Sequence, residues 1–278
     1  MAIITVSRGS MSGGAKFAER LAQKLAYPCL GREVIVREAE RLMSPKHDRP
    51  VHPKIGIGAW ERLTTDRCLY FAAVQSVLID ACLSGKLVYH GHSGHMLLKG
   101  VPAVLKIRLI APLAMRIDTL MERQGLGYEA ARDYIHDIDH ERARWTKFVY
   151  GVDWMDPLNY DLVINMADFD LETACEMVVT VVNRPPWTNT ELLQKKLSDF
   201  ALACRVKLAL AECPDCRTIC FNTVAEDGKV EVLAEVAGSG SWLKRSGPTE
   251  EKVRAVVEKI NGVKQVKVNL HWFAGTDA

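Results

Sequence analysis

The sequence predicts an α/β fold in which helices flank a parallel sheet, followed by a smaller α+β domain. β-rich runs alternate with helical patterns through about the first two thirds of the chain, and such alternation is typical of a parallel sheet covered on both faces. A glycine-rich turn, residues 9–14, lies between the first β-rich run and the first helical pattern. The stretch RPPWTN at 184–189 breaks this rhythm, so a second domain is expected after it.

The composition is that of an ordinary globular protein. The 278 residues allow two domains, and 48% of them are apolar and 25% charged. The net charge of +2 predicts neither nucleic-acid binding nor an acidic tail. No apolar run reaches the roughly 18 residues of a membrane helix, and the N-terminus lacks the order of a signal peptide. We therefore expect a cytoplasmic protein whose eight cysteines are mostly reduced thiols.

The elements of the first domain follow from local periodicity. A β-rich run at 3–7 leads into the glycines, and apolar positions from Phe17 to Leu25 then recur at helical spacing. A loop rich in proline and glycine, 43–58, separates the next two helical patterns. Further strands are expected in GKLVYHGHSGH, AVLKIRLIAP and YDLVINM, and further helices at 33–42, 64–84, 113–124, 128–147 and 171–183.

The second domain has a different order, α, β, β, α, β. A helix at about 190–211 precedes a β-hairpin with Asp227-Gly228 at its turn, which is the strongest short hairpin signal. Thr249 is expected to cap the next helix, and Gly262 to end it. The stretch KQVKVNLHW then alternates as a half-buried strand.

The glycine-rich turn has the spacing of a phosphate-binding loop without its usual lysine. Gly9 and Gly14 match GxxxxGK, but Ala15 follows, and Lys16 comes one residue late. Backbone N–H groups in such a turn, with the positive end of a helix dipole, can bind phosphate without a lysine. A tight turn packed by small residues would explain the glycines as well. The position after a first strand, the flanking serines and Arg8 favour phosphate binding.

Residues 1–183 resemble the bacterial cytidylate kinase-like family of P-loop proteins. Members commonly begin with a strand, then SR, then a loop rich in serine and glycine that lacks the standard lysine. Here these residues are Ser7, Arg8, Ser12, Gly13 and Gly14, with Met11 in place of a glycine. LGREVIVREAERL resembles the segment that opens the monophosphate-binding helices, and DIDHERARWTKFVYGVDWMDPLNYDLVIN resembles the arginine-bearing lid and the strand after it.

This resemblance implies a P-loop kinase fold that uses ATP with Mg²⁺, and no resident metal site. The expected ATP contacts are Arg8, Gly9, Ser12, Gly13 and Gly14. The expected catalytic cations are Arg142, Arg144 and Lys16, and the expected substrate contacts are Arg32, His92 and Asp139. Arg116 is a weaker candidate. A solvated helix face with ion pairs is an alternative interpretation of the arginine-rich stretch.

The HGHSGH stretch admits two interpretations. His90, His92 and His95 follow a predicted strand, where ligand loops of α/β sheets lie. Three histidines could ligate zinc, but no acid or thiol nearby in the sequence completes a ligand shell. In related kinases this loop commonly carries an arginine that helps to hold the nucleotide, and His92 stands in that place. Imidazole carries less charge at neutral pH, which argues against strict cytidylate specificity.

Residues 197–271, after a linker at 184–196, resemble a BON domain. EDGKVEVLAEVAG and INGVKQV carry the likeness, which implies binding to a protein or lipid partner. A packing or dimerising appendage is the alternative. Four cysteines, Cys204, Cys213, Cys216 and Cys220, could bind a metal or an iron–sulfur cluster, or could be small buried apolar residues. The other cysteines, Cys29, Cys68, Cys82 and Cys175, are expected to be isolated core residues.

Two functions are compatible with these features. The first is ATP-dependent phosphoryl transfer to a nucleoside monophosphate, cytidylate-like, or to another small molecule. The second is nucleotide sensing without turnover, in which the BON-like domain binds a partner or ligand. A phosphoryl-transfer assay separates the two.

Overall fold

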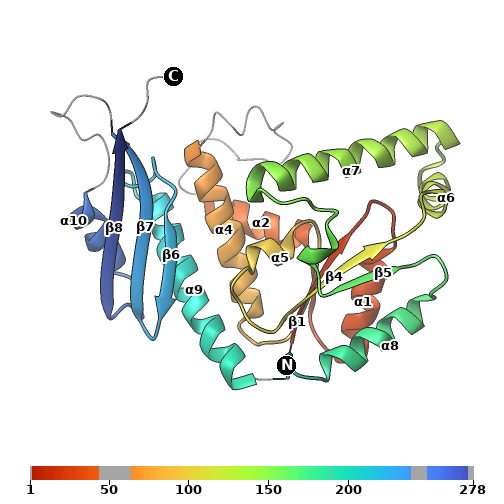
Figure 1. Ribbon diagram of the computed structural model, residues 1–278, viewed down its shortest axis with the longest axis horizontal. Coiled ribbons are helices and arrows are strands. Elements are labelled where there is room, and N and C mark those ends of the chain that lie inside the picture. The colour runs from red at the N-terminus through yellow and green to blue at the C-terminus, as the bar shows by residue number, and fades with distance from the viewer. Residues whose placement is uncertain (1, 44–63, 189, 239–248, 275–278) are drawn as a thin grey trace. The chain divides into compact units, whose positions relative to one another are not determined.

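A computed structural model describes residues 2–43, 64–188, 190–238 and 249–274 (Figure 1). The chain divides into two compact units, which we treat separately. The first unit comprises Met1–Val34 and Cys82–Gln194, and the second comprises Ile35–Ala81 and Lys195–Ala278. The predicted domain boundaries, and the separate folding of the two domains, stay predictions.

The first unit is built on a five-stranded parallel sheet, as predicted. The strand order is β2-β3-β1-β4-β5, and each neighbouring pair is parallel. The strands are β1 (Ile3–Arg8), β2 (Cys29–Gly31), β3 (Leu87–His90), β4 (Val104–Ile110) and β5 (Leu162–Asn165). The three-residue β2 was not predicted, because CLG is too short for a period to be recognised and holds no β-branched residue.

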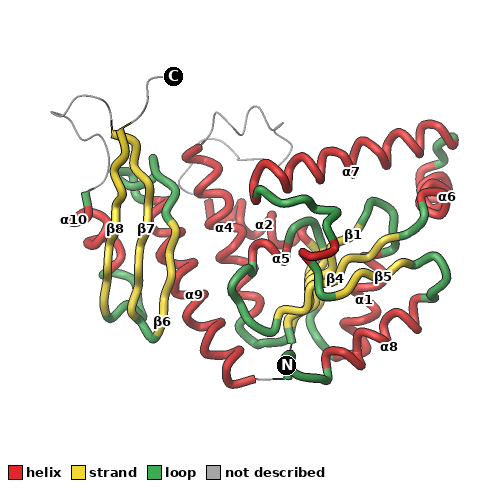
Figure 2. Tube along the Cα trace, viewed as in Figure 1, coloured by secondary structure: helices red, strands yellow, loops and turns green. Residues whose placement is uncertain are grey.

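Helices α1 (Gly14–Leu25) and α8 (Leu171–Val182) cover one face of this sheet. Ile4 and Val6 of β1 pack there against Phe17 and Leu21, and all four side chains are fully buried. Each such side chain contributes roughly 1.5–3 kcal/mol to folding. Figure 2 shows the remaining helical elements of the unit, α5 (Gly94–Leu97), α6 (Leu113–Gln124), α7 (Tyr128–Tyr150) and the 3₁₀ turn η2 (Pro157–Asn159).

The second unit has its own three-stranded sheet, in the order β6-β7-β8. Strands β6 (Asn222–Glu226) and β7 (Lys229–Gly238) form the predicted hairpin, with positive φ at both Asp227 and Gly228, whereas β8 (Gln265–Ala274) pairs parallel to β7. Thr249 accepts a hydrogen bond from the Lys252 N–H at the start of α10 (Glu250–Val257), as predicted. The predicted α, β, β, α, β order is confirmed. The other helices are α2 (Arg32–Met43), α4 (Thr64–Cys82) and α9 (Thr190–Glu212).

Three expectations need correction. Helix α10 ends at Val257, with Glu258 as its C-cap, and not at Gly262 as expected. Residues 190–196 of the expected linker belong to α9, whose Leu193 is fully buried. Cys68, expected to be isolated and reduced, forms a disulfide with Cys220, with the two Cα atoms 5.5 Å apart. The sequence hides this pair because 152 residues separate its members. Most of the predicted loop at 43–58 lies outside the described residues.

The remaining cysteines of the candidate metal set, Cys204, Cys213 and Cys216, are free thiols. Within the described ranges no group of three or more histidine, cysteine or acidic side chains is arranged to hold a metal ion. Among the helices described here, none is long and apolar enough to cross a membrane.

Candidate active site

The glycine-rich loop joins the C-terminal end of β1 to the N-terminus of α1. Gly13 has a φ of 79°, a left-handed conformation that favours glycine, and open space surrounds the position of a Cβ. A Cβ on Gly14 would lie 2.5 Å from Cδ of Arg8, so only glycine fits beneath that side chain. Met11 also has positive φ, and its side chain packs against the α6–α7 cluster of Ile117, Leu120, Ala131 and Ile135.

The start of α1 provides donors for an anion. Its first bond runs from the Phe17 N–H to the Gly13 carbonyl, at 3.0 Å. The N–H groups of Gly14, Ala15 and Lys16 therefore precede the hydrogen-bond ladder of the helix. With the positive end of the helix dipole they form a phosphate-binding arrangement.

Other loop groups maintain the loop itself. The Ser12 hydroxyl donates to the Gly9 carbonyl at 2.9 Å and lies 3.3 Å from the Leu109 carbonyl. The N–H groups of Gly9 and Ser12 donate to the carbonyls of Leu109 and Gly9 at 3.3 and 3.4 Å. In this conformation Gly9 and Ser12 shape the loop, and their predicted contacts with ATP stay predictions.

Two arginines and an aspartate from distant elements hold the loop backbone. Asp139 of α7 accepts a hydrogen bond from the Ser10 N–H at 3.0 Å and forms an ion pair with Arg116 of α6. Arg116 Nε donates to the Ser10 carbonyl at 2.6 Å. Arg142 of α7 donates to the Arg8 carbonyl at 3.2 Å and lies 3.8 Å from Asp139. The predicted lid helix therefore contacts the predicted phosphate loop directly.

The charge of this region is strongly unbalanced. Burial lowers the pKa of Arg142; Asp139 opposes this effect, and the nearby guanidinium groups of Arg8, Arg32 and Arg116 add to it. Arginine stays protonated even so. Among the described residues, Asp139 is the sole carboxylate that forms an ion pair with any of these four arginines. The excess positive charge favours a ligand with several negative oxygens.

His92 faces the same region from the loop after β3. Its Nε2 lies 2.8 Å from the Thr146 hydroxyl, which donates to the Arg142 carbonyl at 2.9 Å. Burial holds the pKa of His92 well below its usual value, and Arg32 and Arg142 lower it further. Because Thr146 uses its proton on a carbonyl, His92 Nε2 carries the hydrogen of a neutral ring, which leaves Nδ1 as an acceptor.

The remaining predicted site residues lie elsewhere on these helices. Lys16 is exposed on α1, and Arg144 is exposed on α7, two residues beyond Arg142 and hence on another face. Their catalytic roles stay predictions. Sequence reasoning underrated Arg116 and missed Thr146. The signal for Arg116 was its place at the start of the helix after β4, where α/β sheets bind ligands.

A buried polar network on the other face of the sheet connects the 151–160 segment to β1 and β4. Arg108 of β4 is 6% exposed, donates to the Trp154 carbonyl, and lies 4.4 Å from the centre of the Trp154 ring. Trp154 Nε1 donates to the Ser7 hydroxyl at 2.9 Å, and the Tyr160 hydroxyl donates to the Trp154 carbonyl at 2.9 Å. In the described part of the chain no carboxylate pairs with Arg108. This network was not anticipated.

Comparison with known proteins identifies the family. The model of the cytidylate kinase-like family matches residues 3–168. The chain belongs to this family. A cytidylate kinase of Methanothermobacter thermautotrophicus is 27% identical over 177 residues, which cover 62% of this chain and 99% of the relative. A cytidylate kinase of Methanopyrus kandleri is 38% identical over 90 residues, 31% of this chain, and the match spans about half of that relative, 46%.

The structural comparison agrees with the fold. An uncharacterized protein from Eubacterium ventriosum matches with a TM-score of 0.53 and 19% identity, over 66% of this chain and 100% of that one. The family match ends before the second sheet, so it does not test the likeness of residues 197–271 to a BON domain. Family membership and the loop geometry support phosphoryl transfer to a nucleotide or another small molecule.

Proposed function

We propose that the protein transfers the γ-phosphoryl group of ATP, bound with Mg²⁺, to a nucleoside monophosphate or a similar small acceptor. The observation that carries this proposal is the excess of guanidinium groups beside the phosphate loop. Arg116 and Arg142 contact the loop backbone and share Asp139 as their ion-pair partner, and Arg8 and Arg32 lie near Arg142 without a carboxylate partner among the described residues. Phosphoryl transfer depends on positioning and on cations around the moving group more than on a protein nucleophile. This arrangement supplies both.

The roles follow from position. The N–H groups at the start of α1 and the side chain of Arg8 would bind the ATP phosphates. Arg142, half-buried beside the loop, would neutralise the transferred group, and Arg116 would keep the loop in shape. Lys16 and Arg144, both exposed, would need side-chain rearrangement to reach the phosphates. We therefore assign them smaller contributions.

The acceptor would bind between Arg32 and His92. Both relatives compared above are named cytidylate kinase, so CMP is the first acceptor to test. A neutral His92 would replace a cation with a hydrogen-bond acceptor at Nδ1. Nδ1 is buried here, so the ring would have to turn toward the site before it could accept from an amino or hydroxyl group of the acceptor. The acceptor phosphate would depend on Arg32.

We propose that residues 197–271 form a BON-like domain that contacts a protein or lipid partner. The α, β, β, α, β order supports this proposal, with a core that includes Phe221, Val232 and Val268. A cytoplasmic location fits an ATP-dependent kinase. The Cys68–Cys220 disulfide is unusual for that compartment, so a count of free thiols in freshly prepared protein tests the location.

A matched pair of glycine variants tests the nucleotide site. Gly13→Asn keeps a residue that tolerates positive φ but places a side chain where the phosphates would lie. Gly125→Asn makes the same change at the end of α6, where φ is 66° and the space is also open. By calorimetry we expect Gly13→Asn to weaken MgATP binding by at least tenfold and Gly125→Asn to leave it unchanged. Equal affinities would overturn the assignment of the loop.

The chemistry is tested by measuring ADP release with CMP, UMP, AMP, GMP and non-nucleotide alcohols as acceptors. We expect turnover with at least one nucleoside monophosphate. Tight MgATP binding without turnover on any acceptor would contradict the kinase proposal while leaving the nucleotide site intact.

A further inference from the structure

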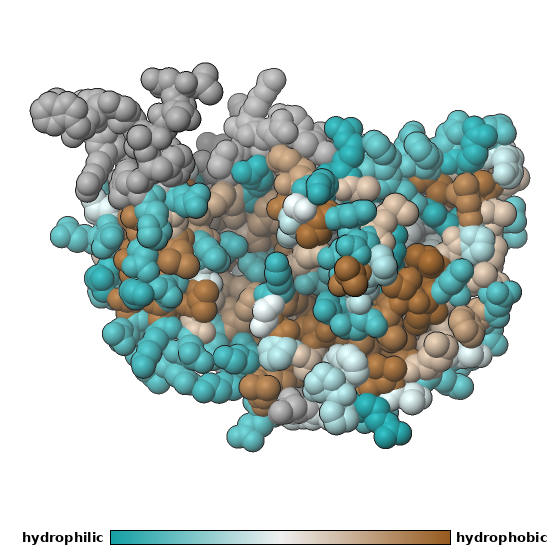
Figure 3. All heavy atoms as spheres, in the orientation of Figure 1, coloured by the Kyte–Doolittle hydropathy of each residue, from teal (hydrophilic) through white to brown (hydrophobic). Residues whose placement is uncertain are grey.

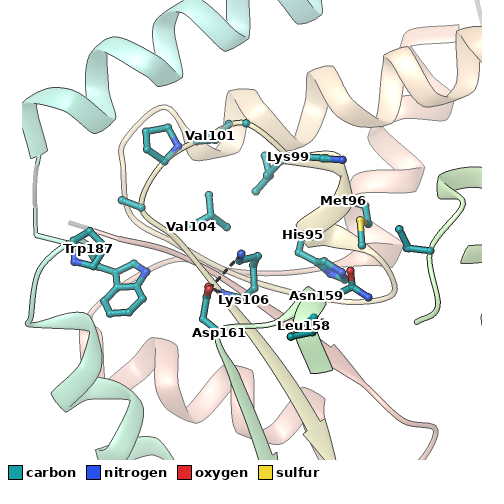
Figure 4. Close-up of a pocket in the computed structure, with 16 residues that line it drawn as sticks. His95, Met96, Lys99, Val101, Val104, Lys106, Leu158, Asn159, Asp161 and Trp187 are labelled. Carbon is teal, nitrogen blue, oxygen red and sulfur yellow. Dashed lines mark hydrogen bonds and ion pairs between the residues drawn. The ribbon is translucent and has the colours of Figure 1, made fainter. Parts of the chain in front are cut away.

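A cavity lies in the first unit, outside the phosphate loop. Its volume is about 440 Å³, and the loop 95–104, Lys106 of β4 and residues 158–161 before β5 contribute to its walls (Figure 4). These residues lie toward the N-terminal ends of β4 and β5. The phosphate loop follows the C-terminal end of β1, whereas Lys106 of the cavity is in register with Thr5 within β1, so the two sites lie at different levels of the sheet. No role assigned above uses this cavity.

The walls of the cavity contain both polar and apolar groups. Leu98, Val101 and Val104 are buried side chains of this lining, and Trp187 and Pro186 contribute on the other side. Figure 3 shows apolar side chains gathered on this face of the first unit, and Leu158 at the cavity is 90% exposed. The size and lining suit a small organic molecule.

Positive charge exceeds negative charge around the cavity. Lys106 Nζ lies 3.2 Å from Asp161, whose other oxygen accepts a hydrogen bond from the Lys106 N–H at 2.8 Å. Lys99, also exposed at the cavity, has no carboxylate partner among the described residues. Two lysines and one carboxylate thus line the cavity, and the buried Arg108 adds positive potential near His95. An anionic ligand is favoured over a cationic one.

His95 supplies an independent sign of a ligand. The side chain is 5% exposed and lines the cavity, yet neither ring nitrogen has a hydrogen-bond partner in the described structure. Its ring lies 4.8 Å from that of Tyr160. Burial, and then Lys106 and Arg108, lower the pKa of His95 to about 4, so the ring is neutral, with one donor and one acceptor. Buried polar groups in folded proteins nearly always have a hydrogen-bond partner. A ligand in the cavity would supply the partner that the His95 ring lacks among the described residues.

We propose that this cavity binds a small monoanion with an apolar body, of the class of aromatic carboxylates. The apolar part of the walls, with Leu98, Val101 and Trp187, would cover the body of the ligand, and its carboxylate would lie near the lysines that line the cavity. A modest rotation of the His95 ring would let its N–H reach the same anion. This proposal does not rest on the proposed kinase activity, because it uses none of the residues of the nucleotide site.

The test uses 8-anilinonaphthalene-1-sulfonate, a fluorescent apolar anion, with the full chain. N-phenyl-1-naphthylamine is its uncharged counterpart. We expect saturable binding of the anion at one site per chain, and binding of the neutral compound at least about tenfold weaker.

Three variants make the test specific. Lys99→Ala should weaken binding of the anion about three- to tenfold, and Asp161→Asn, which removes the competing carboxylate, should tighten it by a similar factor. Lys86→Ala, an exposed lysine that does not line the cavity, should change nothing. Equal affinities in all three variants, equal binding of the neutral compound, or competition with MgATP would each overturn the proposal.

Discussion

The two ends of the sheet in the first unit both carry excess positive charge, but the surroundings of that charge differ. At the C-terminal ends, Arg116 and Arg142 are fixed by Asp139 and by loop carbonyls. At the other end, Lys99 and Lys106 stand beside apolar walls. Guanidinium groups and backbone N–H groups suit an anion with many oxygens, whereas ammonium groups beside apolar walls suit a single charge on an apolar body. The two sites therefore share an excess of positive charge, but they are expected to bind different classes of anion.

The largest expected effect concerns Arg142. Removing a cation from the transferred phosphoryl group costs a factor of about 10³ in rate in related chemistry. We expect Arg142→Ala to lower kcat by about that factor, with little change in MgATP affinity. The measurement is steady-state kinetics combined with calorimetry.

Two controls accompany this variant. Arg132→Ala removes an exposed arginine of the same helix that pairs with Glu129 and Asp133, and it should be neutral. Lys16→Ala should cost much less than Arg142→Ala. A larger loss for Lys16→Ala would mean that Lys16 is a displaced loop lysine.

His95 should make stability depend on pH. Its pKa is about 4 in the folded protein and about 6.5 in the unfolded chain, so between these values the unfolded state binds more protons. The free energy of unfolding should therefore fall as the pH drops from 6.5 to 4, by up to about 3 kcal/mol from this group. Urea unfolding of the wild type and of His95→Gln measures it. The variant should lose that part of the slope, and parallel curves would contradict the prediction.

A variant of Asp139 should distinguish the effect of its negative charge on MgATP binding from its role in positioning the two arginines. Asp139→Asn keeps an oxygen for the Ser10 N–H but removes the negative charge that balances Arg116 and Arg142. We expect MgATP to bind about three- to tenfold more tightly, since the net positive charge rises. The value of kcat should fall, because the arginines lose their anchor. Weaker MgATP binding would show that Asp139 acts mainly by shaping the loop.

The smallest effect is expected at the buried network that connects the 151–160 segment to β1. Trp154→Phe keeps an aromatic ring but removes the N–H that donates to Ser7. Loss of one buried hydrogen bond should lower the free energy of unfolding by about 1 kcal/mol. Thermal unfolding measures this, with Trp145→Phe, a tryptophan on α7 outside this network, as the comparison variant. A destabilisation no larger than that of Trp145→Phe would mean that the contact adds little.

The secondary structure was largely predictable from local patterns. The glycine turn, the Asp227-Gly228 hairpin and the Thr249 cap depend on residues a few positions apart, so the sequence displays them directly. The three-residue strand β2 was not predictable in this way, because it forms only where β3 offers a partner.

The sequence by itself determined the parallel α/β fold, the phosphate loop and the arginine-bearing helix. Only the tertiary structure decided which residues from distant parts of the chain contact one another. Asp139 meets Ser10 across 129 residues, and Cys68 meets Cys220 across 152. The cavity beside His95 likewise combines a loop, two strand ends and the Pro186–Trp187 turn. Such contacts depend on the order of the strands in the sheet and on the paths of the segments that connect them. The spacing of apolar residues along the sequence indicates neither of these.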